Sequence, residues 1–78
     1  MRLPRDLSGR SLVDILCRHW QYVVVHQTGS HVILETESPA HQRISVPNHK
    51  VLRIGTLNSI LRCVAQHKAV MREDILGI

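Results

Sequence analysis

At 78 residues, the chain has room for one domain, residues 1–78, with one hydrophobic core. Hydrophobic residues make up 44% of it and charged residues 21%, which is typical of a globular protein and excludes a disordered one. The net charge of +4 favours a partner that carries phosphate groups or an acidic protein surface. One Trp, one Tyr and no Phe argue against a protein that stacks successive unpaired bases on aromatic side chains.

Targeting and metal-binding signals are missing from the sequence. The first ten residues contain no apolar stretch typical of a signal peptide, and no apolar run approaches the roughly 20 residues that cross a bilayer. Cys17 and Cys63 form no CxxC pair, and each falls in a predicted helix, which favours reduced, partly buried thiols. The histidines lack the compact four-ligand spacing of a structural zinc site. We therefore expect a soluble cytoplasmic protein without a metal or other cofactor.

A first helix is predicted over residues 9–19. Ser8 is a suitable N-cap because its hydroxyl can accept a hydrogen bond from a free N–H group of the first turn. The side chains that follow at intervals of three and four residues would lie on one helix face: Leu12, Ile15, Leu16 and His19.

Three strands are predicted next, over residues 22–27, 31–36 and 42–46. The segments are rich in β-branched residues, and Thr28-Gly29-Ser30 provides a turn between the first two. Pro47 is expected to end the third strand, because proline cannot donate a hydrogen bond to a sheet.

Alternation along the strands separates a core face from an open face. If Val32 and Leu34 point to the core with Ile44 and Val46, neighbouring side chains must point the other way. The open face would then carry His31, Ile33, Glu35, Arg43 and Ser45.

A second helix is predicted to begin around Gly55 or Thr56, with Thr56 as its cap. Its apolar face would be Leu57, Ile60, Leu61 and Val64, while Asn58, Ser59, Arg62 and Gln66 face water. The tail is expected to form a short last helix carrying Val70, Ile75 and Leu76. The resulting α-β-β-β-α order predicts an α+β fold in which two helices cover one face of a three-stranded antiparallel sheet.

Two stretches of the chain resemble the HicA (YcfA-like) family of mRNA interferase toxins. One is Gly29-Ser30-His31 at the hairpin turn, and the other is Val46-Pro47-Asn48-His49 followed by Leu52 and Gly55-Thr56-Leu57. The resemblance covers roughly residues 6–66, and the acidic tail also resembles the short helix of many members. It implies a fold like a double-stranded-RNA-binding domain, metal-independent endoribonuclease activity on mRNA, and neutralisation by a HicB-like antitoxin.

The resemblance further implies that His31 is the catalytic residue. Many family members have a second histidine directly after it, whereas this chain has Val32. RNA carries its own nucleophile, the 2′-hydroxyl, so cleavage needs a base, an acid and cations, and an imidazole suits proton transfer near neutral pH. Gly29 and Ser30 are candidates for hydrogen bonds to the phosphate.

Other residues have two open interpretations. Lys50 and Arg53 precede the second helix, whose free N–H groups favour anions, so they are either phosphate ligands or part of a solvated charged face. His49 is better explained by a hydrogen bond that holds its loop than by a place in the site. Without the resemblance, His31 would be read as a surface residue beside a hairpin turn.

Two other functions remain open from the sequence. A non-catalytic RNA-binding module would keep the positive charge and bind RNA without cutting it. A basic protein-interaction domain would show only nonspecific, salt-sensitive affinity for RNA. Duplex binding as the main role is disfavoured, because the start of the second helix has only Arg53, with Lys50 nearby, in place of a lysine-rich segment.

Overall fold

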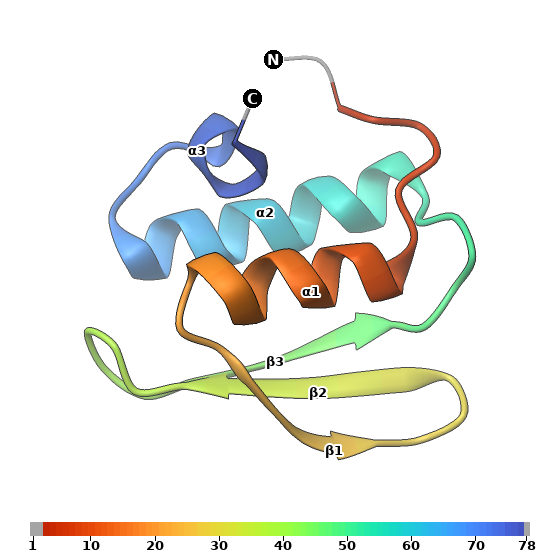
Figure 1. Cartoon of the computed structure of the whole chain (residues 1–78). Coiled ribbons are helices and arrows are strands. Elements are labelled where there is room, and N and C mark those ends of the chain that lie inside the picture. Colours follow the sequence, from red (N-terminus) through yellow and green to blue (C-terminus); the bar gives the residue numbers. More distant parts are fainter. Residues whose placement is uncertain (1–2, 78) are drawn as a thin grey trace.

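The computed structural model describes residues 3–77 of the chain. The elements follow the predicted order, and the α+β fold class is confirmed (Figure 1). They are α1 (Gly9–His19), β1 (Val23–Gln27), β2 (His31–Thr36), β3 (Gln42–Pro47), α2 (Ile54–Lys68) and α3 (Arg72–Leu76). Ser8 caps α1 as expected, since its hydroxyl accepts a hydrogen bond from the N–H of Ser11 at 3.0 Å.

The sheet and the helices form separate layers. The three strands are antiparallel in the order β1-β2-β3. Figure 1 shows α1 and α2 on one face of the sheet, with α3 packed on the far side of these helices. Within residues 3–77, no helix covers the opposite face of the sheet. This layout gives the molecule an open sheet face on which side chains are accessible.

The predicted alternation of side chains is confirmed. Val32, Leu34 and Val46 are at most 2% exposed, and Ile44 is 9% exposed. They pack against apolar side chains of the helices, among them Leu12, Leu16, Leu57, Leu61 and Val64. His31, Arg43 and Ser45 are exposed on the other face, and Ile33 and Glu35 are half-buried there.

Two strand boundaries differ from prediction. The first strand begins at Val23 because Gln21 has a positive φ of 61°, which ends the turn after α1 and directs Tyr22 into the core. The third strand continues through Pro47, which pairs with His31. A proline is tolerated there because β3 is an edge strand and needs no further N–H donor.

The predicted cap of the second helix is wrong. α2 begins at Ile54, with Arg53 in an extended conformation at the N-cap position and no side-chain hydrogen bond to the first turn. Thr56 therefore lies within the first turn. The apolar face is confirmed except that Ile60 is only half-buried, and Asn58 is also half-buried because it accepts a hydrogen bond from Arg72 of α3.

The edge strand β1 is the least covered element of the sheet. All five of its residues are exposed, including Val23, Val24 and Val25 at 45–59%. A bulge interrupts its pairing with β2 between Val24 and His26. In Figure 1, β1 is the lowest strand of the view, at the edge of the sheet.

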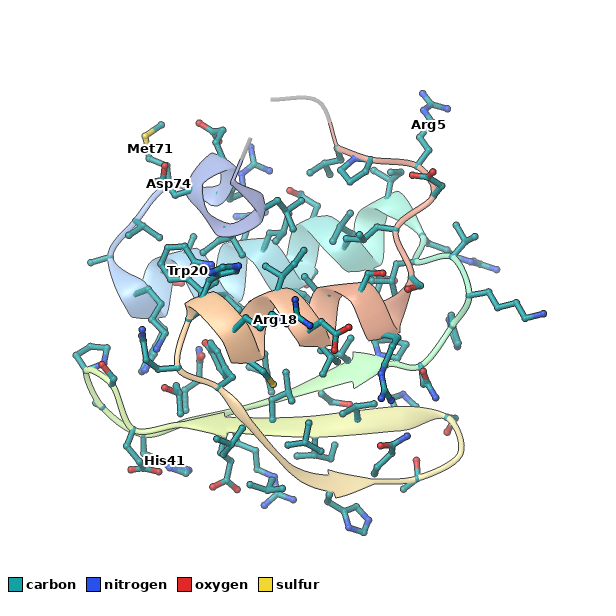
Figure 2. All side chains as sticks on the ribbon, viewed as in Figure 1. Arg5, Arg18, Trp20, His41, Met71 and Asp74 are labelled. Atoms are coloured by element: carbon teal, nitrogen blue, oxygen red, sulfur yellow. The ribbon has the colours of Figure 1, made fainter. Side chains whose placement is uncertain are left out.

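The predicted tail helix exists and closes the core, but it begins at Arg72, so Val70 precedes it. Ile75 is 1% exposed, and its carbonyl accepts a hydrogen bond from the indole N–H of Trp20 at 2.9 Å. Figure 2 shows Trp20 beside the end of α1 and Met71 projecting away from the body of the protein. No helix within residues 3–77 is long and apolar enough to span a membrane.

The two cysteines are free, but only one is partly buried. Cys17 is half-buried, and burial, with a smaller effect of Asp14, raises the pKa of its thiol. The expectation for Cys63 is wrong: this residue of α2 is exposed.

Candidate functional site

The turn before β2 is held by a compact set of hydrogen bonds. The Thr28 hydroxyl accepts from the backbone N–H groups of Ser30 and His31, at 3.3 and 3.0 Å. The N–H of Thr28 also donates to the carbonyl of His31 at 2.9 Å. A short polar side chain that bonds its own backbone stabilises such turns. The position of His31 is thus fixed by local sequence as well as by the sheet.

His31 presents its imidazole to solvent at the start of β2. The Ser30 hydroxyl oxygen lies 3.0 Å from the Nδ1 atom of His31. The carbonyl of Ser30 accepts a hydrogen bond from the N–H of Asn48 at 2.8 Å, which ties the turn to the loop after β3. Because Nδ1 has a neighbouring hydroxyl, Nε2 is the ring nitrogen available to a bound molecule.

His31 borders a shallow depression of about 420 Å³ between the end of β3 and the first two turns of α2. Three hydroxyl groups and one glycine contribute to its walls. The lining residues are His31, Ser45, Pro47, Gly55, Thr56, Ser59 and Ile60. Hydroxyls can both donate and accept hydrogen bonds, so the depression suits a polar molecule such as a phosphodiester.

The start of α2 adds a favourable potential for anions. The helix has 15 residues, and its first turn contains no acidic side chain and no side-chain cap. Its free N–H groups carry partial positive charge at this end. Gly55 and Thr56 belong to this turn and line the depression beside His31. The partial positive charge at the start of α2 would therefore attract an anion bound next to His31.

The two predicted basic residues lie nearby in the chain but not in the walls of the depression. Arg53 is the N-cap residue of α2, and Lys50 belongs to the loop that precedes it; both side chains are exposed. Gly29 is exposed in the turn, and a Cβ atom added to it would meet nothing within 4 Å. The structure thus brings His31 and Ser30 together, whereas Gly29, Lys50 and Arg53 are exposed and do not line the depression.

His49 takes part in the fold through its backbone. Its carbonyl accepts a hydrogen bond from the N–H of Gly9 at 2.9 Å, which joins the loop after β3 to the start of α1. The imidazole itself is exposed. The hydrogen bond that holds the loop therefore exists, although the main chain and not the side chain makes it.

Sequence reasoning missed three hydroxyl residues of the depression. The sequence predicts Ser45 on the open face, Thr56 at the helix cap and Ser59 among the residues of the second helix that face water. No motif connects them, because they meet His31 only through the path of the loop over residues 48–53. The one available signal was the predicted pairing of the second and third strands, which places Ser45 near His31.

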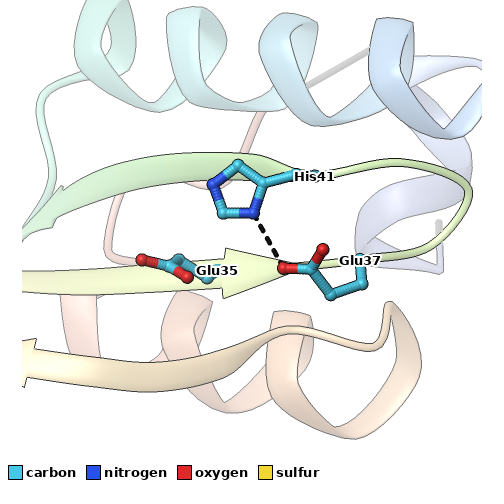
Figure 3. A group of neighbouring side chains, drawn as sticks. All are labelled: Glu35, Glu37 and His41. Atoms are coloured by element: carbon cyan, nitrogen blue, oxygen red, sulfur yellow. Dashed lines mark hydrogen bonds and ion pairs between the residues drawn. The ribbon is translucent and has the colours of Figure 1, made fainter.

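A second polar cluster lies at the opposite end of β2 (Figure 3). Donor atoms of Glu35, Glu37 and His41 lie within 4.8 Å of one another, although the histidine spacing had indicated no metal site. His41 Nδ1 lies 2.7 Å from a Glu37 oxygen, and Arg43 lies 3.4 Å from a Glu35 oxygen. Two ion pairs therefore account for the charges gathered here. The hydrogen bond to Glu37 is the main cause that raises the pKa of His41.

The comparisons with known proteins identify the family. A family model described as the HicA toxin of bacterial toxin–antitoxin systems matches residues 9–64. This chain belongs to the HicA toxin family. The matched range runs from the start of α1 through the sheet and most of α2, and it contains His31 and the whole depression beside it. The short helix α3 lies beyond it.

Membership of the HicA family makes this protein a toxin that has an antitoxin partner. No curated protein and no solved structure matches the chain. The roles of individual residues of this HicA-type toxin therefore have to be argued from the geometry of its own side chains.

Proposed function

We propose that this HicA-type toxin is a metal-independent endoribonuclease that cleaves mRNA, with His31 as the catalytic residue. One observation carries the proposal: the exposed imidazole of His31 borders a hydroxyl-lined depression at the start of α2. That arrangement combines a group suited to proton transfer with a field suited to a phosphate. It lies within the residues that match the family.

The reaction uses the nucleophile that RNA itself provides. The 2′-hydroxyl attacks the adjacent phosphorus atom while a base takes its proton, and the bond to the 5′-oxygen breaks as that oxygen gains a proton. His31 exchanges one of these protons through Nε2, since Nδ1 faces the Ser30 hydroxyl. General acid–base catalysis of this kind contributes about 10²–10⁴-fold to a rate.

The RNA is held mainly through its phosphates. Ser30 and the backbone at Gly29 lie beside His31 and donate hydrogen bonds to phosphate oxygens. Lys50 and Arg53 contact neighbouring phosphates along the exposed rim before α2. Loss of one such cation weakens RNA binding to all sequences alike and lowers the dependence on salt by about one phosphate contact.

The antitoxin in this proposal is a HicB-like protein with an acidic patch. It covers His31 and the basic rim, and the net charge of +4 speeds the encounter. The toxin acts in the cytoplasm, where messages are translated. The whole chain, 1–78, acts as one domain, because the helices and the sheet share a single core in residues 3–77.

The test is cleavage of a long single-stranded RNA by the purified protein in excess EDTA. We expect cleavage at discrete sites, and an oligonucleotide spanning one such site should resist when its attacking 2′-hydroxyl is methylated. Cleavage that stops in EDTA contradicts metal independence. Binding of RNA without cleavage favours the RNA-binding module, and the absence of both favours a protein-interaction domain.

A further inference from the structure

We propose that His26 is the second proton-transfer group of the cleavage reaction and acts with His31 on the same phosphate. This inference rests on the proposed ribonuclease function and assigns to β1 a role in it. The reaction needs both a base and an acid. The residue that follows His31 cannot supply the second group, because Val32 is an apolar core residue with 2% exposure.

The bulge in β1 decides on which face His26 lies. Val24 pairs with Leu34, but the next pair is His26 with Ile33, so Val25 is an extra residue without a partner in β2. In a regular ladder, Val25 would face Ile33, and His26 would face Val32 on the core side. The inserted residue shifts His26 to the side of Ile33, which is the open face. Bulges commonly re-aim a side chain in this way next to active sites.

The same register makes His26 and His31 neighbours. His26 lies opposite Ile33, and His31 precedes Ile33 by two residues on β2, so the two histidines are diagonal partners on one face. The Cβ atoms of diagonal partners are separated by about 7–8 Å or somewhat less, within reach of aromatic side chains. Two imidazoles at this separation can flank the scissile phosphate across β1 and β2, while an adjoining phosphate of the RNA lies in the depression on the other side of His31.

The His26 side chain is also free to act. It is exposed and makes no hydrogen bond or ion pair with any residue in the described range 3–77. His41 and His67, by contrast, are bound to Glu37 and to the carbonyl of Ala40. Of these three histidines, His26 alone combines a place on the open face, His31 as its neighbour and an imidazole that has no hydrogen bond within residues 3–77.

Each of the two histidines carries out one of the two proton transfers of the reaction. One neutral imidazole accepts the proton of the 2′-hydroxyl as its oxygen bonds to phosphorus. The other, as imidazolium, gives a proton to the 5′-oxygen as the bond between phosphorus and that oxygen breaks. The products are a 2′,3′-cyclic phosphate and a 5′-hydroxyl, and exchange of protons with water restores both rings.

The test compares two RNA oligonucleotides that span the same mapped cleavage site. One has the normal linkage, and the other has sulfur in place of the bridging 5′-oxygen, so its leaving group departs without gaining a proton. The full-length native protein is assayed with the variants His26→Gln and His31→Gln. His49→Gln is the matched control, because His49 is an exposed histidine just beyond the end of β3.

We expect both variants to cleave the normal linkage about 10²–10⁴-fold more slowly, and the control to match the native protein. One of the two variants, and only one, should regain a native rate on the sulfur linkage, which identifies the acid. Native rates for His26→Gln on the normal linkage overturn the inference while leaving the ribonuclease function intact. The inference is also overturned if His26→Gln cleaves the normal linkage slowly but both variants, or neither, regain the native rate on the sulfur linkage. If the native protein does not cleave RNA, the proposed function and this inference fail together.

Discussion

Gly9, at the start of α1, faces the backbone of Pro47 so closely that an added Cβ atom would stand 1.9 Å from the Pro47 carbonyl oxygen. The backbone N–H of Gly9 also donates to the carbonyl of His49. Helix α1 is therefore seated directly on the end of β3, beside the strand pair that includes His31. Only a residue without a side chain permits this contact.

We expect Gly9→Ala to lower the free energy of unfolding by about 1–3 kcal/mol, because the helix must move away from β3. Urea denaturation followed by circular dichroism measures the change. Gly55→Ala is the matched control: Gly55 also lies in the first turn of a helix, but an added Cβ atom meets nothing within 4 Å. The free energy of unfolding of Gly55→Ala should stay the same or rise, since alanine has a higher helix propensity than glycine. Equal losses in the two variants would contradict the close contact of Gly9.

The tail beyond the family match contributes to stability through Ile75. Truncation of this fully buried side chain in Ile75→Ala should cost about 2–5 kcal/mol, because it leaves a cavity against α1 and α2. Val51→Ala removes an apolar side chain that is 53% exposed and should change stability by less than about 0.5 kcal/mol. The fluorescence of Trp20, the only tryptophan, reports both unfolding transitions.

Tyr22 provides a second, spectroscopic check of the core. Burial, with a smaller effect of Cys63, raises the pKa of Tyr22 to about 12. Its hydroxyl donates to the Gln42 side chain, and the ammonium of Lys68 lies 4.8 Å from the ring centre. Because Tyr22 is the only tyrosine, phenolate absorbance measures this one group.

We expect ionisation of Tyr22 well above the ordinary pKa of 10 while the protein is folded. The unfolded phenol loses its proton first, so the free energy of unfolding should fall as pH rises from about 10 toward 12. In Tyr22→Phe, this loss should be reduced. A phenolate midpoint near 10 in the folded protein would show that the ring is solvated.

The ion pair of His41 and Glu37 predicts a local pH effect. The hydrogen bond that His41 donates to Glu37, together with the negative charge of Glu37, raises the pKa of His41 above the ordinary 6.5. A raised pKa of a basic group stabilises the folded state below the unfolded pKa, and this contribution disappears as pH rises through the folded value. In Glu37→Gln, the pKa of His41 should fall, as NMR titration of the imidazole would show. An unchanged titration would contradict the pair.

Much of the fold was predictable because local signals agree with the tertiary structure. Ser8 and the helical spacing predicted both ends of α1, and alternation predicted which residues of β2 and β3 face the core. The start of α2 was misplaced because Arg53 caps it through backbone conformation alone, without a side-chain signal.

The site was less predictable than the fold. The turn residues predicted the exposure of His31, whereas its contact with Ser30 was not predicted. The depression depends on how the loop after β3 returns α2 to the sheet, and no local pattern encodes that path. The bulge at Val25 could not be predicted either, because nothing in a run of three valines indicates which residue is unpaired.

The most direct test of the central claim compares the native protein with His31→Ala on the same RNA in EDTA. His31 is exposed, so the variant should keep the native unfolding transition. We predict that it binds RNA with similar affinity and cleaves it at least about 100-fold more slowly, as expected for the loss of a proton-transfer group. Equal cleavage by the two folded proteins would contradict the assignment of His31.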